Sequence, residues 1–133
     1  MNTNNSEYLL EVNNLHTSFF TDSGEVKAVN GVTFNLKPGE IMGIVGESGS
    51  GKSVTAYSIM QILADTGKIT EGEVRFKGED ITKWDKKQMA SFRGKRCSII
   101  FQDPMTSLNP VYTIGNQLME AIRLHTDKTK EQA

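Results

Sequence analysis

The chain has 133 residues and a formal net charge of -1, a length that fits one ordinary domain. Hydrophobic residues make up 37% of the chain and charged residues 23%, which is typical of a globular domain rather than a disordered segment. The near-zero charge gives no sign of a nucleic-acid-binding surface. The single cysteine, Cys97, excludes an intramolecular disulfide and a cysteine-based metal site. No apolar run approaches membrane-spanning length.

The N-terminal segments predict an antiparallel β portion. Residues 8–20 have the composition of a strand, and residues 21–25 combine Asp, Ser and Gly in a turn. Residues 26–36 alternate apolar and polar side chains and predict a second strand. After a further turn, the continuous apolar run at residues 41–45 predicts a strand that is buried on both faces.

The later segments alternate between helix and strand. Apolar residues recur at helical spacing from residue 52 to about residue 64, and residues 72–81 predict a strand or hairpin. A short helix is expected at residues 83–92. A second apolar run follows at residues 97–103, and residues 113–125 predict a further helix. This order of elements predicts an α/β fold that begins with an antiparallel portion.

A glycine-rich loop joins the apolar run at residues 41–45 to the predicted helix. Its sequence, GESGSGKS, matches G-x-x-x-x-G-K-[ST] at every fixed position. Glycines let the backbone curl so that successive N–H groups point inward, and the helix N-terminus adds a positive dipole. The side chain of Lys52 can reach the β- and γ-phosphates, and the hydroxyl of Ser53 can bind Mg²⁺.

The alternative, a glycine-rich turn without a ligand, is disfavoured because a strand precedes the loop and a helix follows it. The loop therefore predicts a site for a nucleoside triphosphate with Mg²⁺. Three of its residues, Glu47, Ser48 and Ser50, contribute mainly backbone donors. The predicted nucleotide-binding residues of the loop are Gly46, Glu47, Ser48, Gly49, Ser50, Gly51, Lys52, Ser53 and Val54.

The segment SIIFQDPMTSLNP, residues 98–110, allows two interpretations. In the first, the apolar run ends in Asp103 as a metal ligand, as in another P-loop enzyme such as a kinase or GTPase. In the second, Gln102 follows an apolar strand and precedes a proline-bounded loop, which is the pattern of the Q-loop of ABC-type ATPases. The second interpretation matches the segment better, and selectivity for guanine would count against it.

Together these segments resemble the ATP-binding subunit of ABC importers for oligopeptides and dipeptides, and of the related nickel importers. The resemblance is carried by VKAVNGVTFNLKPGEIMGIVGESGSGKSVTAYSIM, GEVRFKGEDI and IIFQDPMTSLNPVYTIGNQLMEAI. It implies an α/β, ABC-type P-loop NTPase fold with an N-terminal antiparallel β subdomain and a core sheet that is incomplete in this chain. Residues 1–133 would be the N-terminal portion of a single ABC ATPase domain, with residues 1–40 and 68–82 in the antiparallel part and residues 41–66 and 97–125 in the P-loop core.

The resemblance also implies roles for residues outside the loop. Phe19, with Phe20 as the near alternative, stands where the family has an aromatic residue that stacks on adenine, although a core residue at a strand edge is an equally good interpretation. Gln102 would contact Mg²⁺ or the attacking water. The predicted catalytic residues are therefore Lys52 and Gln102, and the predicted metal ligands are Ser53 and Gln102.

The cofactors and partners implied by the resemblance are ATP, Mg²⁺ and the other parts of an importer. The partners are the ABC permease membrane subunits, a second ATP-binding subunit, identical or homologous, in a head-to-tail dimer, and indirectly an extracytoplasmic solute-binding protein. Residues 103–124 would lie near the surface that docks a coupling helix of the permease. No nucleic acid is expected. Because the start of the chain lacks a signal peptide, we expect the protein at the cytoplasmic face of the cell membrane.

The sequence departs from the family pattern at its end. It has no LSGGQ-like signature, no downstream apolar strand that ends in Asp-Glu, and no switch histidine, since neither His16 nor His125 follows such a strand. We therefore expect the N-terminal part of a longer protein, able to bind Mg-ATP but inactive alone. Two strands that the family inserts between residues 41–45 and 99–102 would be missing, which leaves apolar strand edges uncovered. The alternative is a non-hydrolytic nucleotide-binding module or a regulator of the transporter.

Overall fold

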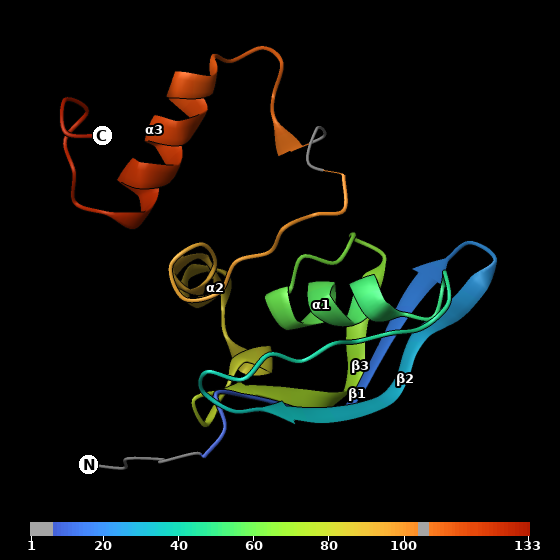
Figure 1. Cartoon of the computed structure of the whole chain (residues 1–133). Helices are drawn as coiled ribbons and strands as arrows, with labels where there is room; N and C mark the ends of the chain where they lie inside the picture. The colour runs from blue at the N-terminus through green and yellow to red at the C-terminus, as the bar shows by residue number, and fades with distance from the viewer. Residues whose placement is uncertain (1–6, 104–106) are drawn as a thin grey trace. The chain divides into compact units, whose positions relative to one another are not determined.

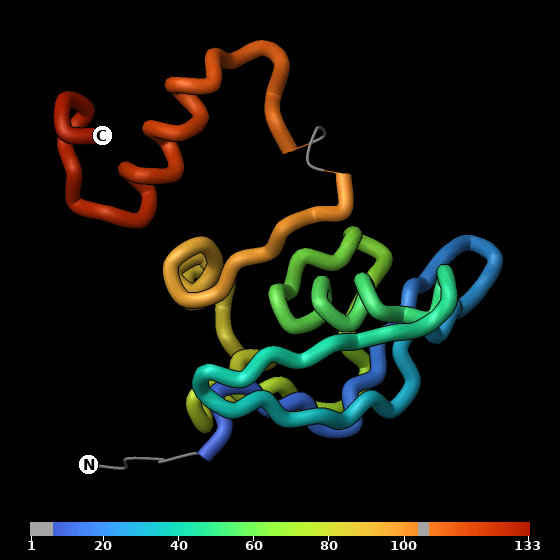
Figure 2. The backbone as a smooth tube through the Cα atoms, viewed as in Figure 1, coloured from blue at the N-terminus to red at the C-terminus, as the bar shows by residue number. Residues whose placement is uncertain are grey.

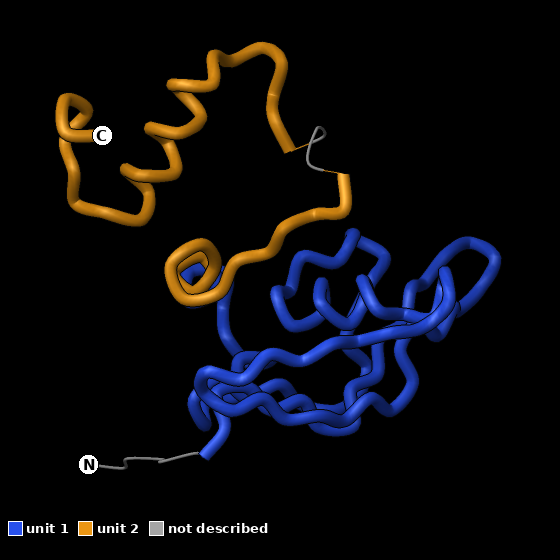
Figure 3. The backbone as a smooth tube through the Cα atoms, viewed as in Figure 1, with its two compact units in different colours: residues 1–89 blue, residues 90–133 orange. Residues whose placement is uncertain are grey.

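The structure, a computed structural model, describes residues 7–103 and 107–133. The chain divides into two compact units, residues 1–89 and residues 90–133, coloured blue and orange in Figure 3. The first unit carries the sheet and the glycine-rich loop, and the second carries the C-terminal helix.

The first unit is built on an antiparallel sheet with the strand order β2-β1-β3-β4 (Figure 1). The predictions of strands at residues 8–20 and 26–36 are confirmed. A tight turn joins the two strands into a hairpin. The third strand begins earlier than residue 72, where the sequence pattern placed its start. The strands are β1 (Leu10–Thr21), β2 (Gly24–Leu36), β3 (Gly67–Phe76) and β4 (Glu79–Asp80).

The core of the first unit follows from the alternation along β1 and β3. Val12 lies opposite Phe34 of β2 and Val74 of β3, and Val12 and Val74 are fully buried. Burying apolar surface of this kind stabilises the fold by about 25 cal/mol per Å². Among residues 7–89, the buried hydrophobic side chains are Val12, Leu15, Val29, Ile59, Met60, Val74, Phe76, Ile81 and Met89.

The first helix, α1 (Lys52–Met60), lies across one face of the sheet. Its buried Ser58 hydroxyl is 2.7 Å from the buried Thr17 hydroxyl of β1, which fixes the helix to the central strand. The helix ends before residue 64 because Gln61 takes a left-handed conformation, with φ of 49°. The side chain of Gln61 then donates to the carbonyl of Ile81 at 2.6 Å.

The prediction of a buried strand at residues 41–45 is wrong for this chain. No strand is formed there, and Ile41 and Val45 are 97% and 93% exposed. Within residues 7–103 and 107–133, no strand pairs with this run, and a strand exists only where a neighbour accepts and donates its backbone hydrogen bonds. Figure 2 shows the segment running from the end of β2 back along the sheet to the start of α1.

Two short helical segments follow β4. The first is the 3₁₀ turn η1 (Ile81–Lys83), in which the backbone N–H of Thr82 donates to Asp80 Oδ1 at 3.0 Å and Lys83 Nζ lies 2.8 Å from Asp80 Oδ2. Burial raises the pKa of Asp80, but the contacts with Lys83 and Thr82 outweigh it and lower that pKa. The second is α2 (Lys86–Phe92), which forms within the helix predicted at residues 83–92.

The second unit contains α3 (Ile114–His125), which confirms the helix predicted at residues 113–125. Thr113 Oγ1 accepts a hydrogen bond from the backbone N–H of Asn116 at 3.3 Å and caps the helix. Ile114 and Leu118 are 64% and 61% exposed on α3. No helix in the described ranges is long and apolar enough to cross a membrane.

The strand predicted within residues 97–103 is not formed. Cys97 makes a single bridge with Arg93, and Ile100 is 94% exposed. The physical reason is the same as for residues 41–45, because no described strand supplies a ladder of hydrogen bonds. Partial burial raises the pKa of the Cys97 thiol, which disfavours the reactive thiolate form.

Candidate nucleotide-binding site

The glycine-rich loop takes a shape that only glycine adopts easily at two of its positions. Gly49 and Gly51 have φ values of 79° and 89°, in the left-handed region. At Gly51 a side chain would also collide with the sheet, since a Cβ there would lie 2.5 Å from the carbonyl oxygen of Ala28 in β2. Gly51 therefore lets the loop turn into α1 while the loop lies directly against β2.

The ammonium group of Lys52 folds back onto the start of the loop. Lys52 Nζ donates to the carbonyl oxygen of Gly46 at 2.7 Å and to that of Glu47 at 2.6 Å, and it lies 3.4 Å from Ser50 Oγ. The lysine thus closes the loop into a ring and places a positive charge at its centre. The loop itself is exposed from Gly46 to Ser50, so an anionic ligand can reach that charge.

The first turn of α1 offers backbone donors beside this charge. The first helical hydrogen bond runs from the Thr55 N–H to the Gly51 carbonyl at 2.8 Å. The N–H groups of Lys52, Ser53 and Val54 precede it, so no helix carbonyl accepts from them. No acidic residue stands in this first turn. The dipole of the helix and these donors together favour an anion.

The side chain of Ser53 is exposed in the same turn, beside the free amides. Within residues 7–103 and 107–133, no group of three or more His, Cys, Asp or Glu side chains is arranged to hold a metal ion. A hydroxyl oxygen suits Mg²⁺, which usually takes few protein ligands and completes its shell with waters and phosphate oxygens. The residues present therefore fit a magnesium–triphosphate group better than a metal held by protein ligands alone.

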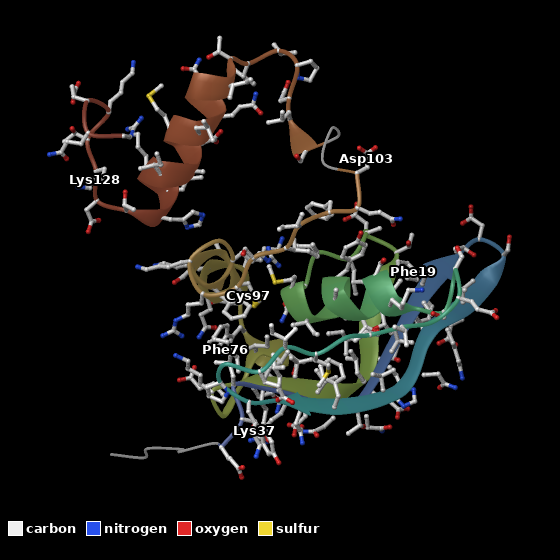
Figure 4. All side chains as sticks on the ribbon, viewed as in Figure 1. Phe19, Lys37, Phe76, Cys97, Asp103 and Lys128 are labelled. Carbon is white, nitrogen blue, oxygen red and sulfur yellow. The ribbon has the colours of Figure 1, made fainter. Side chains whose placement is uncertain are left out.

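Phe19 is placed at the end of β1 that lies beside α1 (Figure 4). It is opposite Val26 of β2 and Gly67 of β3, and its ring lies against the backbone of Gly67. Phe19 is half-buried, whereas Phe20 is 45% exposed. Phe19, the glycine-rich loop and α1 all belong to the first unit, and the role of Phe19 beside adenine stays a prediction.

Gln102 and Asp103 do not belong to the unit that carries the glycine-rich loop. Both are exposed and belong to the second unit, at the end of the apolar run that forms no strand. Residues 104–106 of the predicted proline-bounded loop lie outside the described residues. The role of Gln102 as a ligand of Mg²⁺ or water stays a prediction, as does the alternative role of Asp103.

Sequence reasoning missed the residues that support the loop from behind. Thr17 and Ser58 anchor α1, Ala28 contacts Gly51, and Gly67 seats the ring of Phe19. Thr17 and Ser58 carry no sequence signal, because a polar residue in a strand or helix is ordinarily expected to face water.

Comparison with known proteins identifies the family to which the chain is similar. The sequence profile of the family described as ABC transporter matches residues 29–133. The chain is 50% identical over 128 residues to the dipeptide transport ATP-binding protein DppD of Bacillus subtilis, and 49% identical over 125 residues to the oligopeptide transport ATP-binding protein OppD of Salmonella typhimurium. These matches cover 96% and 94% of this chain but 38% and 37% of the relatives. The chain thus spans less than two fifths of their length.

Solved structures show the same fold. A dimeric, post-hydrolysis state of the ATP-binding cassette MJ0796, bound to ADP and Pi, matches with a TM-score of 0.76 and 24% identity, over 90% of this chain and 49% of that one. A nucleotide-free ATP-binding cassette from an ABC transporter matches with a TM-score of 0.54 and 26% identity, over 85% and 46%. The predicted fold class is confirmed. With a family profile over most of its residues and curated relatives at about half identity, the chain belongs to the ABC transporter family.

Proposed function

We propose that this chain binds Mg-ATP as the N-terminal part of the ATPase subunit that powers peptide uptake by an ABC importer. The observation that supports this most directly is the position of Lys52, whose ammonium group lies inside the loop at 2.7 Å and 2.6 Å from two loop carbonyls. The loop is exposed from Gly46 to Ser50, and the amides of Lys52, Ser53 and Val54 have no helix carbonyl as acceptor. We place the β- and γ-phosphates against this charge and these amides.

The loop residues have separate roles in this proposal. Lys52 binds and orients the phosphate oxygens, the amides from Gly49 to Val54 donate hydrogen bonds to them, and Ser53 places Mg²⁺. The metal ion held there would supply positive charge beside the phosphate oxygens. Phe19 stacks on adenine, which is supported by its partly exposed ring on the strand beside α1.

Hydrolysis and transport are proposed for the whole protein, not for this chain alone. Gln102 would contact Mg²⁺ or the attacking water there. The dipeptide and oligopeptide transport names of the relatives support a peptide as the solute. We propose as partners the permease subunits and a second ATP-binding subunit, at the inner face of the membrane. Dimeric cassettes among the structural neighbours support the second subunit.

The test is the affinity of the chain for Mg-ATP with and without the lysine charge. We expect Lys52→Ala to weaken binding about tenfold or more, because a hydrogen bond to a charged group contributes about 1.5–3 kcal/mol. Lys52→Gln removes the charge but keeps a neutral, slightly shorter polar side chain at the same position. Lys87→Ala, which removes an exposed lysine from α2, is the matched control and should bind as wild type does.

Two results would contradict the proposal. One is an unchanged affinity of the Lys52→Ala variant for Mg-ATP, and the other is tighter binding of GTP than of ATP by the wild-type chain.

A further inference from the structure

We infer that Gly67 is a positioning residue for the adenine contact, because the absence of a side chain at Gly67 lets the ring of Phe19 lie against β3. The inference rests on the proposed function, in which Phe19 stacks on the base. It adds a residue that lies outside the glycine-rich loop and outside every motif in the sequence.

The contact between the two residues is close. A Cβ atom added to Gly67 would lie 2.7 Å from Cε1 and 3.1 Å from Cδ1 of Phe19. Carbon atoms pack at about 3.5–4.0 Å, so any side chain at position 67 overlaps the present position of the ring. The ring therefore occupies the space that a side chain at position 67 would fill.

The backbone around Gly67 is held on both sides, so the ring rather than the strand has to yield. The Gly67 N–H donates to the Ala64 carbonyl at 2.7 Å, and the Phe20 N–H donates to the Thr66 carbonyl at 2.9 Å. The added Cβ would also lie 3.1 Å from Leu63 Cβ, which blocks a shift in that direction. Phe19, by contrast, can rotate about its side-chain torsions.

Gly67 is also a clean position for substitution. Its φ lies outside the left-handed region that disfavours other residues, unlike those of Gly49, Gly51 and Gly72. Alanine at position 67 therefore adds a collision with the ring without adding backbone strain. We expect Gly67→Ala to fold and to turn the ring of Phe19 away from its present position.

The experiment compares two probes, Mg-ATP and Mg-tripolyphosphate, which lacks a base. We expect Gly67→Ala to weaken Mg-ATP binding about fivefold to tenfold, the loss expected for one base–aromatic stack, and to leave Mg-tripolyphosphate binding unchanged. In the Phe19→Ala background, Gly67→Ala should have no further effect. Gly115→Ala, which adds a methyl group where nothing lies within 4 Å, is the control and should bind both probes as wild type does.

A second measurement tests the contact without any ligand. In a chain with labelled phenylalanine, Gly67→Ala should shift the aromatic resonances of Phe19 more than those of the other phenylalanines. Unshifted Phe19 resonances would overturn the inference. So would wild-type affinity for Mg-ATP, an equal loss for both probes, or additive effects of Gly67→Ala and Phe19→Ala. A wild-type chain that binds neither probe would overturn the proposed function itself, and the inference with it.

Discussion

The pair of buried hydroxyls between β1 and α1 gives a sharp prediction about stability. Ser58 Oγ is 2.7 Å from the carbonyl oxygen of Val54 and 2.7 Å from Thr17 Oγ1. Because a carbonyl only accepts, Ser58 donates its proton to Val54 and accepts the proton of Thr17. The two partners are therefore not equivalent, and removing each should have a different effect.

The magnitudes follow from what each substitution leaves behind. Thr17→Val removes the donor and leaves Ser58 with its bond to Val54, so we expect the free energy of unfolding to fall by about 1 kcal/mol. Ser58→Ala leaves the hydroxyl of Thr17 buried without an acceptor, which costs about 1–3 kcal/mol. The double variant leaves neither group unsatisfied, so Thr17→Val should recover part of the stability that Ser58→Ala loses.

Urea denaturation followed by the fluorescence of Trp84, the single tryptophan, measures these differences. Thr21→Val is the control, because its hydroxyl bonds to the Gly24 carbonyl at an exposed end of the same strand, and we expect a change below about 0.5 kcal/mol. A double variant less stable than Ser58→Ala would refute the assigned direction of the hydrogen bonds.

Three further predictions concern other features of the structure. Gly51→Ala should abolish Mg-ATP binding, measured by calorimetry, because φ is 89° and the new Cβ would lie 2.5 Å from Ala28 O; binding at wild-type strength would contradict the described loop. Asp80→Asn should lower the free energy of unfolding by about 1 kcal/mol at neutral pH. Since the folded-state pKa of Asp80 is lowered, this difference should be present above its ordinary value of 3.8 and vanish as pH falls through the lowered pKa; a difference that persists in acid would count against the charge. Cys97 should react with iodoacetamide more slowly in the native chain than in urea, because burial raises its pKa; equal rates would show that the thiol is exposed.

The parts of the fold that local sequence determines were predictable, and the parts that need a distant partner were not. The hairpin of β1 and β2 and the capped helix α3 depend on neighbouring residues, and both form where the pattern placed them. The run at residues 41–45 has the composition of a buried strand. It is exposed because no described strand pairs with it. The composition of the run cannot tell whether a partner strand is present.

The candidate site divides in the same way. The motif identified the loop and the residue type at Lys52, because the chemistry of phosphate binding fixes both. The contact of Lys52 with two loop carbonyls and the seat of Phe19 on Gly67 depend on three-dimensional packing. No spacing rule connects residue 19 with residue 67, since the strands between them decide which residues meet.

The two ends of the glycine-rich loop are held differently. Its downstream end is anchored by the contact of Gly51 with β2 and, through α1, by the hydrogen bond between Ser58 and β1. Its upstream end continues into the exposed run at residues 41–45. The hydrogen bond from the Lys52 ammonium to Gly46 holds this upstream end to the rest of the loop. A strand that pairs with residues 41–45 would order the upstream end of the loop before nucleotide binds. Nucleotide binding would then carry a smaller cost in conformational entropy. Such a strand would raise the affinity of the loop for Mg-ATP. Because the two binding events are thermodynamically linked, Mg-ATP would raise the affinity of residues 41–45 for the strand by the same factor.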